Sequence, residues 1–232
     1  MSFKNGKDYL YLIWQDKVSR RQYIVGQLSK NGQYEFCYSN EIKDALEAGF
    51  KPLVPFDDLN KTYYSDTLFS TFSSRLPDKK RKDIRKILEK YGLQEYDAYA
   101  LLKASGARLP IDSLHFVDPI LDISTAFDRD FYMAGARHYL ACDGEDCLLV
   151  TELDRGDQLF LKKEPDNKQD AYAIEIMTGN NKRVGYIPRY YSKAFTRLLD
   201  ENREIVCHVK RIEKNKPCSE CVTLHIEVSA ID

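Results

Sequence analysis

Residues Glu164 to Arg189 read EPDNKQDAYAIEIMTGNNKRVGYIPR, and this stretch decides the fold of the second part of the chain. Two β-type runs, residues 172–177 and 183–187, flank a Gly-Asn-Asn-Lys turn and predict a hairpin. Residues 165–170, just before it, are rich in Asp and Asn, whose short side chains bond neighbouring backbone groups. We therefore expect a rigid polar loop on a β scaffold, which is a common setting for ligand binding.

The composition describes a soluble globular protein with an uneven charge distribution. Of the 232 residues, 43% are hydrophobic and 31% are charged, and the net charge is −1. Residues 1–118 carry 19 Lys and Arg against 16 Asp and Glu, whereas the remainder carries 16 against 20. The part that contains the hairpin is therefore net negative, which excludes a generally basic surface that would hold nucleic acid by bulk attraction.

The N-terminal sequence predicts neither a signal peptide nor a membrane anchor. The first apolar run, residues 9–14, is too short for a signal peptide. No segment reaches the roughly 20 apolar residues that are needed to cross a bilayer. We therefore expect a cytoplasmic protein whose cysteines are reduced thiols.

The pattern of apolar and turn residues predicts an α+β protein of two domains. Residues 1–118 contain three β-rich runs up to residue 38, which we expect to form a meander, and a strand at 113–117. Their helical segments include 79–91, with Asp78 as its expected cap, and 98–105, with Asp97 as its expected cap. Residues 119–129 form the expected linker, because they mix Pro, Asp, Ser and Thr with few apolar residues. Residues 130–232 are mainly β, with a strand expected over 131–139 and one amphipathic helix over 192–201.

Several motifs in residues 131–230 resemble the HIRAN domain, a small barrel-like β module. They occur in the family's order: Ala134-Gly135-Ala136-Arg137-His138-Tyr139, Gly156-Asp157-Gln158-Leu159, Glu164-Pro165-Asp166-Asn167 with Asp170 and Ala173-Ile174, and Val184-Gly185-Tyr186-Ile187-Pro188-Arg189. The resemblance implies a pocket that binds the 3′-hydroxyl end of single-stranded DNA.

Carried over residue by residue, the resemblance assigns roles to eight residues of this chain. Arg137 and Arg189 would contact phosphates, Tyr139 would line the pocket, and Asn167 and Asp170 would hold the terminal sugar. A carboxylate accepts a hydrogen bond from a free 3′-hydroxyl but repels a phosphate, so the pocket would detect ends. The same implied DNA-binding set includes Tyr186 and two residues at positions used for base stacking in other members: His138 and Gln169. Histidine can stack on a base, whereas glutamine has no π face.

The first domain resembles the N-terminal subdomain of HipA-type serine/threonine kinase toxins over residues 9–118. The matching segments are Tyr23-Ile24-Val25-Gly26-Gln27-Leu28, Leu76-Pro77-Asp78, and Tyr96-Asp97-Ala98-Tyr99-Ala100-Leu101-Leu102 with Ser105-Gly106-Ala107. No Gly-rich nucleotide loop or metal-binding Asp motif of a kinase follows them. The resemblance implies a domain that docks on a kinase partner.

Four cysteines are candidate ligands for a metal ion. Thiolates of Cys142, Cys147, Cys218 and Cys221 would bind zinc tetrahedrally if their two loops meet; otherwise they are ordinary thiols. We find no catalytic constellation, and we expect no cofactor and no enzymatic activity.

These observations lead to two functional hypotheses. The first is a non-enzymatic protein that recognises 3′ ends of single-stranded DNA and couples this recognition to a protein-interaction domain. The alternative is an antitoxin-like subunit that binds and restrains a HipA-type kinase.

Overall fold

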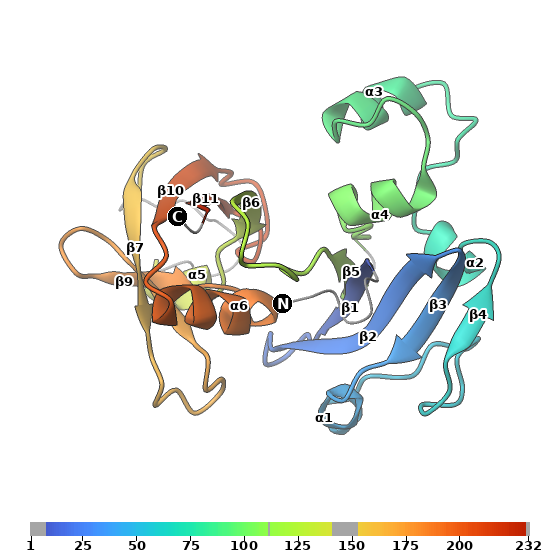
Figure 1. Cartoon of the computed structure of the whole chain (residues 1–232), viewed down its shortest axis with the longest axis horizontal. Coiled ribbons are helices and arrows are strands. Elements are labelled where there is room, and N and C mark those ends of the chain that lie inside the picture. The colour runs from blue at the N-terminus through green and yellow to red at the C-terminus, as the bar shows by residue number, and fades with distance from the viewer. Residues whose placement is uncertain (1–7, 111, 141–152, 231–232) are drawn as a thin grey trace. The chain divides into compact units, whose positions relative to one another are not determined.

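The computed structural model describes residues 8–110, 112–140 and 153–230, and it divides the chain into two compact units with the boundary after Pro119 (Figure 1). Each unit has its own antiparallel sheet. In the described part of the chain no helix has both the length and the apolar character needed to span a membrane.

The first unit is built on a five-stranded sheet in the order β4-β3-β2-β1-β5. Its strands are β1 (Tyr9–Gln15), β2 (Gln22–Asn31), β3 (Gln33–Tyr38), β4 (Tyr63–Ser65) and β5 (Leu114–Val117). Four helices accompany them: α1 (Ile42–Glu47), α2 (Ser70–Ser73), α3 (Ile84–Lys90) and α4 (Ala98–Ser105). The three β-rich runs that open the chain form the predicted meander, since β2 pairs with both β1 and β3.

A cluster of phenylalanines forms the centre of this unit. Phe36 on β3 contacts Phe56 and Phe72, with ring centroids 4.4 and 5.2 Å apart, and Phe72 contacts Phe116 on β5 at 5.1 Å. All four side chains are buried. These four rings are part of a larger buried cluster that joins the sheet to the segments that cover it.

The helices of the first unit agree with the sequence signals to different degrees. Asp97 caps α4 as predicted, because its Oδ1 accepts hydrogen bonds from the amides of Tyr99 (2.8 Å) and Ala100 (3.0 Å), and Gly106 ends the helix with φ +68°. The helix expected over residues 79–91 is shorter, since α3 begins at Ile84. Asp78 does not cap it; its carboxylate instead accepts the amide of Lys80 at 2.7 Å in a turn.

The second unit is a six-stranded curled sheet in the order β6-β11-β10-β7-β8-β9. Its strands are β6 (Phe127–Tyr132), β7 (Gln158–Lys163), β8 (Ile174–Met177), β9 (Arg183–Tyr186), β10 (Ile205–Ile212) and β11 (Val222–Val228). Two helices, α5 (Ala136–Tyr139) and α6 (Arg189–Asp200), complete it. The predicted α+β class and the mainly β second part are confirmed.

The sheet curls because its two edge strands are connected. Ala134, just after β6, pairs with Tyr186 on β9 through two backbone hydrogen bonds of 2.9 and 2.8 Å. Gly185 makes this approach possible, since a Cβ there would lie 2.5 Å from Cγ of Met133 and 2.7 Å from the carbonyl oxygen of Ala134. Phe195 and Tyr191 of α6 pack against Phe131 on β6, with ring centroids 6.2 and 5.7 Å apart.

Two boundaries in this unit differ from the sequence expectation. The strand expected over residues 131–139 ends at Tyr132, because Gly135 adopts a left-handed conformation (φ +76°) and the chain turns into α5. The helix expected from residue 192 begins at Arg189, directly after Pro188, whose fixed φ suits the residue before a helix. Both changes place predicted site residues on helices.

Candidate functional site

The polar loop between β7 and β8 is fixed by two of its own side chains. Asn167 Oδ1 accepts the amides of Gln169 (2.9 Å) and Asp170 (3.1 Å). Asp170 Oδ1 accepts the amide of Tyr172 at 2.9 Å. These bonds are the Asx turns that the sequence indicates, and they make the loop rigid without helix or strand.

The second carboxylate oxygen of Asp170 faces α6. Ser192 Oγ lies 2.7 Å from Asp170 Oδ2 and 2.8 Å from the carbonyl oxygen of Arg189. Ser192 is buried, so this contact holds the half-buried carboxylate at the start of α6. An ionised carboxylate has about four acceptor positions, of which the described contacts occupy two. Asp170 therefore keeps acceptor capacity for a further donor.

Glu164 connects the loop to β9. Its Oε2 lies 2.5 Å from Nδ2 of Asn167 and 2.7 Å from the hydroxyl of Tyr186, and both groups donate to it. These hydrogen bonds, first that of Asn167, then that of Tyr186, hold the pKa of Glu164 below its usual range, and the positive charge of Arg183 acts in the same direction. Burial and the bond to Glu164 raise the pKa of Tyr186. The loop and the strand thus share one charged acceptor.

Arg183 joins this group to α5. Its Nη1 lies 2.5 Å from Glu175 Oε1, 3.2 Å from Glu164 Oε1 and 2.8 Å from the hydroxyl oxygen of Tyr186. Its guanidinium carbon lies 4.8 Å from the ring centre of Tyr139 and 5.5 Å from that of Tyr186. These five residues form what we call the tyrosine–arginine cluster, and in it the two rings meet at 5.8 Å.

Five of the eight predicted site residues fall into two groups in the structure. Tyr139 and Tyr186 lie in the tyrosine–arginine cluster, and Asn167 is connected to them through Glu164. Asp170 contacts the start of α6 through Ser192, whose hydroxyl also contacts the backbone carbonyl of Arg189, the first residue of that helix. The other three side chains are exposed, two on α5 and one in the loop: Arg137, His138 and Gln169.

Sequence reasoning gave no role to the residues that hold the site together. Glu175 is a charged residue within the apolar run of β8 and is 8% exposed, so a partner for it was predictable. That partner is Arg183, two residues before Gly185 on the neighbouring strand. Ser192 gave no signal of its own, because nothing in a helical sequence indicates that its hydroxyl meets the loop.

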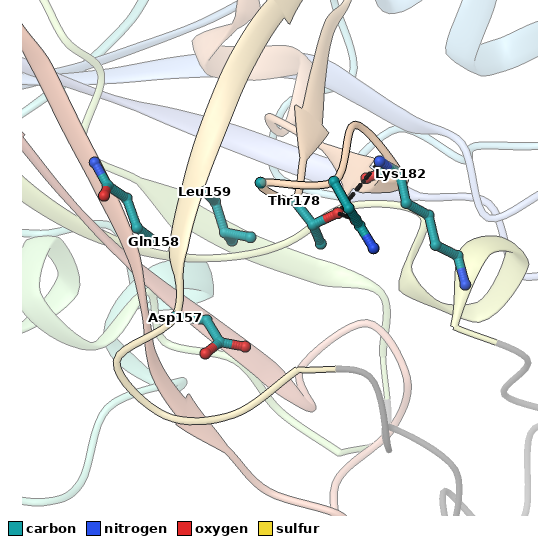
Figure 2. A pocket seen from close by; sticks show the side chains of 7 residues that line it. Asp157, Gln158, Leu159, Thr178 and Lys182 are labelled. Atoms are coloured by element: carbon teal, nitrogen blue, oxygen red, sulfur yellow. Dashed lines mark hydrogen bonds between the residues drawn. The ribbon is translucent and has the colours of Figure 1, made fainter.

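A separate hollow of about 570 Å³ lies at the other end of β7 and β8 (Figure 2). It is lined by residues from the start of β7 and from the β8–β9 turn, including Asp157, Gln158, Thr178 and Lys182. The turn is held by the backbone amide of Lys182, which donates to Thr178 Oγ1 at 3.2 Å. None of the predicted DNA-binding residues lines this hollow.

The cysteines do not support the four-thiolate zinc site. Cys142 and Cys147 lie outside the described residues. Cys218 is disulfide-bonded, so the expectation that every cysteine is reduced is wrong for it. Cys221 is a buried cysteine outside any disulfide, and its thiol donates to the carbonyl oxygen of Cys218 at 3.4 Å. Among residues 8–110, 112–140 and 153–230, no group of three His, Cys, Asp or Glu side chains is placed to hold a metal ion.

Comparison with known proteins identifies both parts of the chain. Residues 127–229 match the HIRAN domain family, and residues 17–110 match the HipA N-terminal domain family. A Fanconi-associated nuclease 1 homolog of Arabidopsis thaliana is 33% identical over 52 residues, which are 22% of this chain and 6% of that protein. The match thus spans a small fraction of the relative.

Solved structures with some similarity to this chain include HIRAN domains. The crystal structure of the HIRAN domain of human HLTF is 18% identical, with 46% of this chain and 81% of that chain covered and a TM-score of 0.33. An NMR structure of the same domain in its DNA-bound conformation covers 46% and 77% at 18% identity, with a TM-score of 0.30. A Lactobacillus plantarum protein is 23% identical, with 45% and 93% covered and a TM-score of 0.36.

Proposed function

Because residues 127–229 are a HIRAN domain and residues 17–110 are a HipA N-terminal domain, we propose that this chain binds the 3′-hydroxyl end of single-stranded DNA through its HIRAN domain. A HIRAN domain, that of human HLTF, has been solved in a DNA-bound conformation. In this chain the proposal rests on the carboxylate of Asp170, which is fixed by its neighbours and keeps free acceptor positions.

The surroundings of Asp170 suit a terminal nucleotide. Its carboxylate lies at the start of α6, where backbone amides point outward and the positive end of the helix dipole favours an anion such as a phosphate. A terminal 3′-hydroxyl donates a hydrogen bond to the carboxylate, while a 3′-phosphate meets like charge there. In the same site, Arg189 and the N-terminal end of α6 would bind the backbone phosphate of that nucleotide.

The tyrosine–arginine cluster supplies the aromatic part of the site. Tyr139 and Tyr186 present ring surface next to the loop, and Arg183 holds both rings from one side. Stacking of a base on an aromatic ring contributes about 1–3 kcal/mol. Gln169, at one family stacking position, gives no such contribution, so we expect the tyrosines and His138 to carry the base contacts.

The direct test compares oligonucleotides that differ only in the terminal group. A thymidine oligonucleotide with a 3′-hydroxyl is expected to bind, and the same oligonucleotide with a 3′-phosphate is expected to bind at least tenfold more weakly. Equal affinity for both, or no binding of either, would contradict end recognition. Fluorescence anisotropy with a label at the 5′ end measures both affinities without touching the terminus.

The variant must remove the charge of Asp170 without opening the loop. Asp170→Ala also removes the acceptors of Tyr172 and Ser192, so a loss of binding would be ambiguous. Asp170→Asn keeps an acceptor oxygen in nearly the same shape, and we expect it to reduce the preference for hydroxyl over phosphate. Asp166→Asn is the matched control, because Asp166 is an exposed carboxylate of the same loop.

A second function is favoured by the HipA N-terminal domain match. We propose that residues 8–118 dock on a HipA-type kinase, which would make the chain a restraining subunit of an antitoxin-like pair. Co-expression with a kinase body that lacks this domain tests the proposal. A stable complex with lowered kinase activity supports it, and separate elution with unchanged activity argues against it.

A further inference from the structure

A second hollow in the HIRAN unit, of about 560 Å³, lies between the loop that precedes β7 and the end of β10. Among the described residues, its charged lining is four cations and one acid: Arg155, Lys210, Arg211, Lys214 and Asp154. We call it the basic hollow. All five residues are exposed. The surrounding half of the chain is net negative, so this concentration of positive charge is local.

A β-bulge in β10 places two successive cations in the basic hollow. In the pairing with β11, Val209 faces Leu224 and Arg211 faces Thr223, so Lys210 is an extra residue on its strand. Successive side chains of a regular strand point to opposite faces of the sheet. The extra residue breaks this alternation, and Lys210 and Arg211 both line the hollow.

The opposite wall of the hollow is a rigid turn. The amide of Asp157 donates to the carbonyl of Asp154 at 3.1 Å, and the carboxylate of Asp157 accepts the amide of Asp154 at 2.7 Å. Gly156 takes the positive φ of +94° that the turn requires, and its amide donates to Val209 of β10 at 2.8 Å. Arg155 is thus presented from a turn that is tied directly to the bulged strand.

The ion pairs leave part of the positive charge available. Lys210 lies 2.5 Å from Asp130, and Arg211 lies 3.1 Å from Glu213. Within the described part of the chain, Arg155 and Lys214 have no acidic partner. Two cations on opposite walls of an open hollow are therefore left to bind an anion from outside.

We propose that the basic hollow binds backbone phosphates of a single-stranded nucleic acid whose 3′ end occupies the Asp170 site. This inference rests on the proposed function for the kind of ligand. Gln158 to Lys163 separate the two sites along β7, a path of roughly 20 Å at about 3.3 Å per residue. Nucleotides of a stacked strand advance about 3.4 Å each, so a trinucleotide is too short to reach both sites and a dodecanucleotide is long enough.

The test uses the full chain, with Arg155→Gln and Lys214→Gln combined. Binding of 5′-labelled trithymidylate and dodecathymidylate with a 3′-hydroxyl is measured over a range of salt concentrations, and the same oligonucleotides with a 3′-phosphate are measured beside them. We expect the variant to bind the dodecamer about threefold to thirtyfold more weakly, and the trimer unchanged. For the dodecamer, the slope of log affinity against log salt should be about 1.4 smaller in magnitude in the variant, since each lost phosphate contact removes about 0.7.

The matched control removes two exposed cations of the first unit. Lys43→Gln with Lys51→Gln gives the same change in net charge, and neither lysine belongs to the unit that holds the basic hollow. Asp154→Asn removes a negative charge instead of a positive one and should tighten dodecamer binding, because Asp154 is the one acid among the described residues that line the hollow. Equal thermal midpoints for all variants show that each protein is folded.

The outcomes separate this proposal from end recognition. If the double variant and the control bind the dodecamer alike, the basic hollow is not a phosphate site and the proposal is overturned. The trimer could show no preference for the 3′-hydroxyl while binding of the dodecamer still depends on Arg155 and Lys214. In that case end recognition is refuted and the basic hollow is retained as a phosphate site. If the wild-type chain binds neither oligonucleotide, both proposals are overturned.

Discussion

Gly185→Ala is expected to open the connection between the two edges of the HIRAN sheet. The added methyl group would lie 2.5 Å from Met133 Cγ and 2.7 Å from the carbonyl oxygen of Ala134, well inside contact distance. If the chain stays closed, the overpacking costs about 1–3 kcal/mol. If it opens, the two hydrogen bonds between Ala134 and Tyr186 are lost, at about 0.5–1.5 kcal/mol each. Both routes therefore destabilise the connection by about 1–3 kcal/mol.

Amide hydrogen exchange measures this opening at the residues concerned. The amides of Ala134 and Tyr186 form the two hydrogen bonds, and a local loss of 1–3 kcal/mol should accelerate their exchange by roughly fivefold to 150-fold. Gly179→Ala is the control, because its new methyl group meets nothing closer than a Phe160 carbon at 3.9 Å. Equal exchange in the two variants would refute the reasoning from close approach.

Three further perturbations follow from single contacts. The pKa of Glu164 is held below its usual value of 4.5, first of all by the hydrogen bond from Asn167, so its contribution to stability is complete above about pH 4.5 and is lost as the pH falls through the lower folded-state pKa. Glu164→Gln should remove this loss of stability at low pH. Identical profiles of the thermal midpoint against pH for the wild-type chain and the variant would contradict this expectation. Asp97→Ala removes the cap of α4 and should cost about 0.5–2 kcal/mol in urea unfolding of the first unit, whereas an unchanged midpoint would show that the cap contributes nothing. Burial raises the pKa of the Cys207 thiol to about 12, so iodoacetamide should modify the partly exposed Cys37 first in the native protein, and the reverse order would be inconsistent with the packing.

The parts of the fold that depend on local chemistry were predictable from the sequence. Asp97 and Gly106 fix both ends of α4 because a cap acts within one helical turn. The Asx turns around Asn167 and Asp170 are also local, and the structure has them where the sequence indicates. Short-range hydrogen bonds leave a signal in the spacing of residue types.

The parts that depend on long-range contacts were not predictable in the same way. Gly135 breaks the expected strand because Ala134 must pair with β9 and the chain must then turn away. Arg183 and Ser192 acquire their roles only when β9 and α6 lie beside the loop. The bulge at Lys210 is likewise set by the register with β11, which no residue type in β10 specifies.

The extra residue in β10 has a consequence for how this domain can change during evolution. Every side chain beyond Lys210 points to the side opposite to the one that regular alternation from the start of the strand would give. Deleting Lys210 would restore regular pairing and leave Arg211 and Ile212 opposite Thr223 and Val222 as they are now, so the basic hollow would lose one cation while the other side chains keep their faces. The charge of the hollow is thus governed by an insertion or deletion in the gene as much as by any substitution, and homologous chains that differ in length at this strand should differ in this surface.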